Sequence, residues 1–158
     1  MLSITTYAST RIARSPAEVW DYVTTPANWV GAHPVAKAVR GDVHRPAPAG
    51  ARWTEVVEVG GEIVELEWTA TAVDTSDAEW LWRIEADPSL TSDPADGRVH
   101  VGITYTFLTD GDCTVFGRTV NVRYSGGASI PLRYRDAWTD ESADIHYLDT
   151  IKRALEEE

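Results

Sequence analysis

The sequence has one cysteine, few basic residues and no long apolar run, and each shortage excludes a class of protein. Cys113 cannot form an internal disulfide, and the first residues lack the basic and apolar regions of a secretory signal, so we expect a cytoplasmic protein. Only 14 basic residues stand against 25 acidic ones, and a net charge of -11 repels nucleic acid and anionic lipid. No apolar run approaches the roughly 20 residues of a membrane helix. We therefore expect no nucleic-acid partner and no membrane span.

Metal and cofactor motifs are also missing. The four histidines (His33, His44, His100 and His146) lack the two- or four-residue spacing that places a pair on one metal. No phosphate loop, dinucleotide fingerprint or nucleophile elbow is present. The sequence predicts neither a metal site nor a cofactor, and we expect His44, His100 and His146 to face solvent.

The chain is large enough for one domain with a substantial core. Its 158 residues leave no room for a second domain, and 43% of them are hydrophobic. Seven tryptophans are many for this length. They either fill a thick core or line a ligand cavity, and the sequence leaves both readings open.

The first helical signal is a capping box that begins at Ser15. Pro16 stands at the first helical position and Glu18 can reach back toward the cap. Thr25-Pro26 breaks this helix, and residues 27–29 can begin a second short one. Two short helices therefore follow a first strand at about residues 2–13.

The apolar period then changes to two, which is typical of strands. Turn residues separate a weak strand near 36–43 from five more at about 51–59, 62–73, 78–86, 98–109 and 113–124. The stretch 87–97 is acidic, rich in Pro and Ser and long for a hairpin, so it is either a functional flap or an ornament. These intervals predict an antiparallel meander.

The end of the chain reads as one long amphipathic helix. Its apolar stripe contains Trp138, Ile145, Leu148, Ile151 and Leu155. Ser129 and Thr139 both look like caps, and residues 130–138 form either its beginning or a separate turn.

This order of elements and several motifs resemble the START-like (SRPBCC) superfamily, specifically its polyketide cyclase/dehydrase branch. The residues that carry the resemblance are the run from Ile12 to Trp29, Gly50 to Trp53, Glu65 to Thr69, Val101 to Phe107 and the ending Leu148 to Leu155. The resemblance implies a single α+β domain over residues 1–158 with the helix-grip fold, in which a curved antiparallel sheet of six to seven strands wraps around a long C-terminal helix. It also implies an internal hollow for apolar compounds such as aromatic polyketides, lipids or sterols. Family members often carry a tryptophan where Ala32 precedes His33-Pro34, so one cavity wall is missing here.

His33 and Tyr105 are the candidate catalytic residues. His33 follows the second short helix at the expected mouth of the hollow, where an ordinary histidine pKa suits a general acid or base. The alternative is a loop histidine that packs on Pro34. Tyr105 lies in an inward row and could polarise a ligand carbonyl for enolisation or aldol closure, or be a core tyrosine.

Charged residues near the expected hollow have two readings each. Arg118 stands among apolar residues, and exposure is its simpler reading, because inside it would need a carboxylate partner or an anionic ligand. Asp144 lies near the buried stripe, but nothing in the sequence pairs it. Arg133 and Arg135 stand close to Tyr134 and Trp138 and either rim the entrance or form a solvated patch.

The residues expected to contact the ligand are mostly aromatic or branched apolar ones. They are Trp29, Trp53, Trp68, Trp82, Ile103, Arg118, Tyr134, Trp138, Ile145 and Leu148.

Three functions compete. The first is a cyclase, aromatase or dehydratase, the second a carrier or sequestering protein for a lipid-like or aromatic metabolite, and the third a protein-interaction module. A small free ligand is favoured over one delivered on an acidic carrier protein, because two acidic proteins repel each other. The sequence leaves open whether the chain forms a homodimer.

Overall fold

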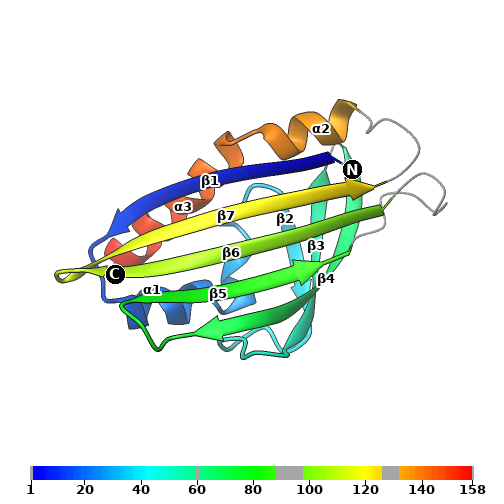
Figure 1. The fold of residues 1–158 in the computed structure, drawn as a ribbon. Helices are drawn as coiled ribbons and strands as arrows, with labels where there is room; N and C mark the ends of the chain where they lie inside the picture. Colours follow the sequence, from blue (N-terminus) through cyan, green and yellow to red (C-terminus); the bar gives the residue numbers. More distant parts are fainter. Residues whose placement is uncertain (1, 60, 88–97, 126–131, 158) are drawn as a thin grey trace.

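A seven-stranded antiparallel sheet wraps around the helices of this domain. The computed structural model describes residues 2–59, 61–87, 98–125 and 132–157, without the side chains of residues 132–134. The strands are β1 (Leu2–Ile12), β2 (Ala36–Arg40), β3 (Arg52–Val59), β4 (Glu62–Asp74), β5 (Glu79–Ala86), β6 (Arg98–Asp110) and β7 (Cys113–Ser125). Their spatial order is β1-β7-β6-β5-β4-β3-β2, so only the first strand leaves sequence order (Figure 1). The six strands after the first form the expected meander.

Two of the described turns between neighbouring strands contain a glycine with a positive φ. Gly61, between β3 and β4, has a φ of 82°, and Gly111, between β6 and β7, has a φ of 60°. Residues with a Cβ rarely adopt this left-handed conformation, and tight hairpins require it.

Two short helical segments follow β1, as the sequence predicts. Helix α1 spans Pro16–Val23, and η1 is a 3₁₀ turn over Pro26–Trp29 rather than a second α-helix. The Ser15 hydroxyl accepts a hydrogen bond from the Glu18 backbone N–H at 3.3 Å and donates one to the Glu18 carboxylate at 3.1 Å. The N-cap at Ser15 is therefore confirmed and fixes where α1 begins, while the Glu18 carboxylate reaches the Ser15 hydroxyl rather than its backbone N–H.

The C-terminal helical region is divided in two. Helix α2 spans Leu132–Thr139 and α3 spans Ser142–Glu156. The expected cap at Thr139 is wrong, because its hydroxyl donates to the Arg135 carbonyl at the end of α2. The Asp140 carboxylate instead accepts the Ser142 N–H at 2.9 Å, just before α3. The other expected cap, Ser129, lies outside the described residues.

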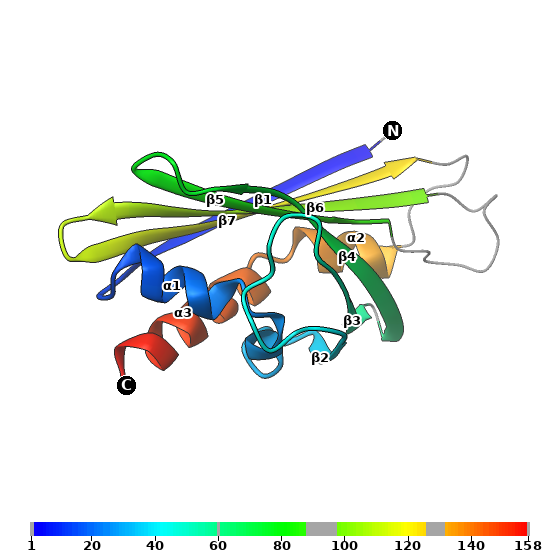
Figure 2. The ribbon, with the colours of Figure 1, turned by 90° about the horizontal axis from the view of Figure 1, so that it is seen from below.

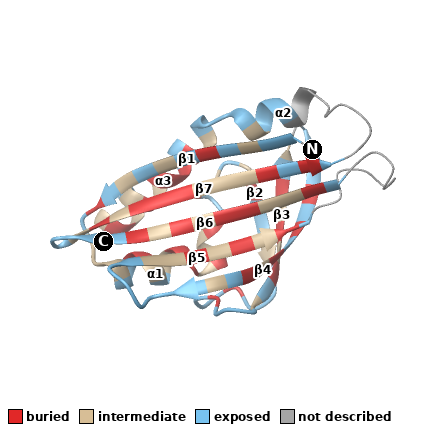
Figure 3. Cartoon of the chain, viewed as in Figure 1, coloured by how far each residue is buried: buried red, intermediate tan, exposed pale blue. Residues whose placement is uncertain are grey.

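Helices α1 and α3 lie on the concave side of the sheet, where β2 and β3 curl around toward them (Figure 2). Helix α2 contacts β1 and β3 near the end of the sheet where β1 begins. Buried and more exposed positions alternate along the strands (Figure 3). On β4, for example, Val64 and Trp68 are buried and Glu65 and Glu67 are exposed, because successive side chains of a strand point to opposite faces.

A cluster of aromatic side chains borders a cavity. The Trp53 and Trp82 rings stack with centroids 5.8 Å apart, and Trp29 packs edge-on against both. The Tyr105 ring centroid lies 5.5 Å from that of Trp82 and 6.0 Å from that of Phe116, so the cluster continues across the sheet. This packing accounts for much of the aromatic content and leaves the remaining space nearer to α2.

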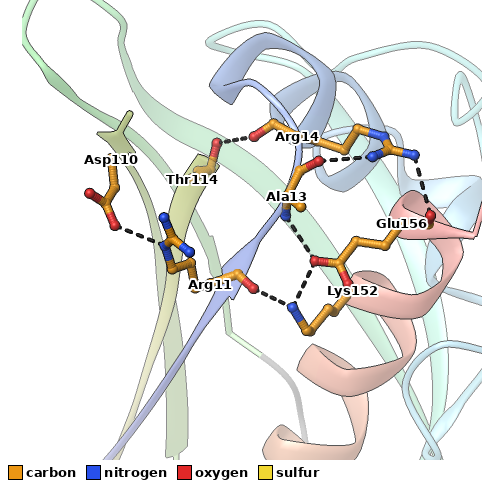
Figure 4. A network of polar contacts seen from close by, with 7 residues as sticks. All are labelled: Arg11, Ala13, Arg14, Asp110, Thr114, Lys152 and Glu156. Atoms are coloured by element: carbon orange, nitrogen blue, oxygen red, sulfur yellow. Dashed lines mark hydrogen bonds and ion pairs between the residues drawn. The ribbon is translucent and has the colours of Figure 1, made fainter. Parts of the chain in front are cut away.

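Polar contacts fasten the C-terminal end of α3 to the end of β1 (Figure 4). The Lys152 ammonium donates to the Arg11 carbonyl at 2.6 Å, and the Glu156 carboxylate accepts from the Ala13 N–H at 2.8 Å. Arg14 donates to the Glu156 carbonyl at 3.3 Å. The helix is therefore held in the grip of the sheet at this end.

Candidate functional site

A cavity of about 280 Å³ lies between the concave face of the sheet and helices α2 and α3. This volume lies just below the roughly 300–1,000 Å³ of most ligand pockets, so the cavity suits only a small organic molecule. Most of its lining is apolar: Trp29, Val35, Val57, Val59, Val64, Leu66, Trp68, Val99, Val101, Ile103, Val120, Val122, Ala137, Trp138 and Ala143. Ala137 and Asp140 line it and are exposed, so the cavity reaches solvent beside α2.

Arg118 is buried at the polar end of the cavity, and the expectation that it faces solvent is wrong. Its side chain is 9% exposed, and its Nη1 donates to the Asp144 carboxylate of α3. The Thr6 hydroxyl donates to the other Asp144 oxygen at 3.1 Å. The partner that a buried guanidinium requires is therefore present, in a residue that the sequence left unpaired.

Two tyrosines lie next to the guanidinium. The Arg118 central carbon is 5.8 Å from the Tyr105 ring centroid and 5.1 Å from that of Tyr147. Arg118 Nε donates to the Tyr105 hydroxyl at 3.4 Å. Burial raises the pKa of Tyr105 and of Tyr147, so both hydroxyls keep their protons near neutral pH.

Glu55 supplies a second carboxyl, and it titrates near neutral pH. Its residue is 7% exposed, and the Trp68 indole N–H donates to its Oε1 at 2.9 Å. Burial raises the pKa of Glu55 to about 7, although the Trp68 hydrogen bond and the Arg118 charge oppose the rise. A carboxyl with such a pKa can both take up and release a proton near neutral pH.

His33 is a half-buried neutral imidazole at this polar end. Its ring centroid is 5.7 Å from that of Tyr147, and its Nδ1 accepts the Val35 N–H at 3.3 Å. Burial lowers the pKa of His33 to about 3, and the positive charge of Arg118 contributes to the decrease. Because Nδ1 accepts a hydrogen bond, the neutral ring carries its proton on Nε2.

The residues and segments expected at the site divide into four groups. Residues that line the cavity are Trp29, His33, Trp68, Ile103, Tyr105, Arg118 and Trp138. Trp53, Trp82 and Leu148 are buried but belong to the packed core instead. Ile145 is 53% exposed and outside the lining, so its expected ligand contact is wrong. The side chains of Tyr134 and Arg133, and the 88–97 part of the expected flap, lie outside the described residues.

Glu55, Asp144 and Tyr147 were not assigned to the site from the sequence. Glu55 shares the inward face of β3 with Trp53 and Val57, and an acidic residue in an apolar row was an available signal. Tyr147 lies beside the buried Leu148 on α3, where an aromatic residue reads as core. No sequence pattern pairs Asp144 with Arg118.

Neither a metal cluster nor a membrane span is found in the described part of the chain. Residues 2–59, 61–87, 98–125 and 132–157 contain no group of three or more His, Cys, Asp or Glu side chains that could hold a metal ion. None of their helices is long and apolar enough to cross a membrane. His44 and His146 are exposed as expected, whereas His100 is half-buried between Glu85 and Asp87.

Comparisons with known proteins agree on family and fold. Residues 3–142 match the family described as polyketide cyclase / dehydrase and lipid transport. Penitrem biosynthesis cluster 1 protein I of Penicillium ochrochloron is 31% identical over 149 residues, which cover 92% of each chain.

Two similar solved structures support the fold. A norcoclaurine synthase structure from Thalictrum flavum, in complex with dopamine and hydroxybenzaldehyde, has a TM-score of 0.63 and 16% identity, covering 99% of this chain and 88% of that one. A START superfamily protein from Mycobacterium smegmatis has a TM-score of 0.60 and 12% identity, covering 97% of each chain. At these identities the two structures bear on the fold alone.

Proposed function

Because the chain belongs to the polyketide cyclase / dehydrase and lipid transport family, we propose that it binds a small, largely apolar molecule in its cavity and catalyses a cyclisation or dehydration of it. The family match agrees with the resemblance drawn from the sequence motifs. The relative named for penitrem biosynthesis supports a role in making a small molecule.

The observation that carries the catalytic part is the position of Glu55. It is a buried carboxyl with a pKa of about 7, it lines an apolar cavity, and its Oε1 is held by the Trp68 N–H. No described residue hydrogen-bonds to Oε2, which is therefore available to the ligand. An acid–base group is most effective when its pKa lies near the working pH.

The reaction needs one base and one donor. The ionised Glu55 takes the proton from the carbon next to a ligand carbonyl, and the electron pair of that C–H bond moves onto the carbonyl oxygen. Tyr105 donates a hydrogen bond to this oxygen, and Arg118 stabilises its negative charge. In a dehydration the enolate then expels a β-hydroxyl group, which takes the proton back from Glu55 and leaves as water. In a cyclisation the enolate carbon bonds to a second carbonyl carbon, whose oxygen receives the proton.

In this assignment Tyr105 remains the hydrogen-bond donor to the ligand carbonyl. His33 is not the general acid or base that the sequence suggested. A conjugate acid with a pKa of about 3 makes neutral His33 a weak base. We propose that its Nε2–H donates to the ligand.

A model substrate tests the proposal. The aldol adduct of benzaldehyde and acetone dehydrates to benzylideneacetone, whose conjugated system absorbs in the near ultraviolet. We expect the protein to accelerate this step, with a rate that rises as pH passes through about 7, where Glu55 ionises. Glu55→Gln should reduce the rate by about 100-fold or more. Glu67→Gln, at an exposed position of β4, is the matched control and should leave the rate unchanged.

A non-catalytic carrier is the second candidate. Arg118 is already neutralised by Asp144, and most of the cavity wall is apolar, so enclosure of a ligand does not itself require chemistry. Tight binding of the substrate with equal rates for the wild type and Glu55→Gln would favour the carrier and contradict the catalytic assignment.

A further inference from the structure

The Tyr147 hydroxyl is buried, and the described part of the chain offers it no hydrogen-bond partner. Tyr147 is 2% exposed, lines the cavity from α3, and its hydroxyl oxygen has no partner among the described residues. The Tyr105 hydroxyl lies near enough to influence the pKa of Tyr147, but among the described residues no hydrogen bond joins the two oxygens. Buried polar groups nearly always have partners, so one is expected from outside the chain.

Arg118 has donor capacity left over beside this hydroxyl. Nη1 donates to Asp144 and Nε to the Tyr105 hydroxyl. Within the described part of the chain no partner is found for Nη2, and the guanidinium is 5.1 Å from the Tyr147 ring centroid. Nη2 and the Tyr147 hydroxyl therefore lie at the same end of the cavity.

Most of the other polar groups there add donors, and Glu55 Oε2, for which the described residues supply no partner, is the acceptor that remains. The Tyr105 oxygen accepts from Arg118, which leaves its own proton free to donate. The neutral His33 ring carries its proton on Nε2, because Nδ1 accepts from Val35. Among the acceptors, both Asp144 oxygens are already occupied, by Arg118 and by Thr6.

Resting on the proposed function, we propose that the buried end of the cavity recognises a carbonyl oxygen of the ligand, held by the Tyr147 hydroxyl and Arg118 with Tyr105 beside them. An acceptor oxygen satisfies the surplus donors, whereas a purely hydrocarbon end leaves them unpaired. A permanent carboxylate fits less well, because Asp144 already neutralises Arg118 and Glu55 adds acidity nearby. The ligand class is therefore a neutral ketone with an apolar body.

A matched pair of probes tests this inference. Methyl naphthyl ketone and ethylnaphthalene have nearly the same shape and differ in the carbonyl oxygen. Their affinities are measured by tryptophan fluorescence titration with wild type, Tyr147→Phe and Tyr7→Phe, whose ring lies exposed on β1. Wild type should prefer the ketone, and Tyr147→Phe should weaken ketone binding about two- to tenfold without changing ethylnaphthalene binding. Tyr7→Phe should behave as wild type.

The outcomes separate the two proposals. Equal affinities for the two probes, or an unchanged ketone preference in Tyr147→Phe, would overturn the carbonyl site and leave cavity binding in place. Failure of both probes to bind would overturn the proposed function as well. Thermal unfolding of Tyr147→Phe is the third measurement, and a clear loss of stability would contradict the inference, because it would mean that the hydroxyl already has a partner in the protein.

Discussion

Replacing Glu55 with glutamine should remove a pH-dependent destabilisation of the folded protein. Glutamine keeps the oxygen that accepts from the Trp68 indole N–H but has no carboxyl to ionise. The wild-type carboxyl is 7% exposed and ionises only with a pKa of about 7, compared with an ordinary value of 4.5. The variant therefore isolates the free-energy cost of a buried negative charge.

The size and sign of this cost follow from the two pKa values. Between pH 4.5 and about 7 the unfolded chain has lost the Glu55 proton while the folded chain still holds it, so stability falls as pH rises through that window. The loss is complete above about pH 7. A tenfold change in an ionisation constant corresponds to about 1.4 kcal/mol, which gives a total of about 3 kcal/mol.

Urea unfolding followed by tryptophan fluorescence measures the effect across the pH range. The stability of Glu55→Gln relative to wild type should increase by about 3 kcal/mol between about pH 4 and pH 8. His33 acts in the opposite direction, because burial lowers its pKa and its stabilising contribution is lost as pH falls from 6.5 toward about 3. Both proteins carry His33, so its contribution cancels in the comparison.

Parallel stability curves for the two proteins would refute this reasoning. They would mean that Glu55 ionises with an ordinary pKa and is therefore hydrated in solution. The catalytic proposal would then lose its acid–base group, although the cavity would still accommodate a ligand. Glu67→Gln should follow the wild-type curve, because that side chain is exposed in the folded state too.

Two further predictions concern the polar end of the cavity. Arg118→Met should lower the free energy of unfolding, measured by urea denaturation, by about 3–5 kcal/mol, because it leaves a buried carboxylate without its cation. Adding Asp144→Asn should recover part of that loss. Additive effects of the two substitutions would show that the pair does not interact. Trp68→Phe removes the hydrogen bond that lowers the pKa of Glu55, so the pH midpoint of the stability loss caused by Glu55 ionisation should move upward. An unchanged midpoint would contradict the role of Trp68 in setting this pKa.

The local patterns of the sequence determined the elements of the fold. Alternation along β4 places Trp68 inward and Glu67 outward, and Ser15 with Glu18 fixes the start of α1, because these features depend on residues within a few positions of each other. The resemblance to the family predicted how these helices and strands are arranged in space. Trp29, His33 and Tyr105 line the cavity, whose position follows from the order of elements that the family shares, and their contacts with a ligand stay predictions.

Tertiary structure alone decided which inward residues form the site. Arg118 and Asp144 are paired across 26 positions by the packing of α3 on the sheet, and no local period records such a contact. Tertiary packing also decided that Trp53 and Trp82 fill the core and that Ile145 faces solvent. The titration of Glu55 depends on burial beneath several elements at once. Periodicity specifies the face on which a side chain lies, whereas its neighbours, and therefore its chemistry, are set by the long-range packing of strands and helices.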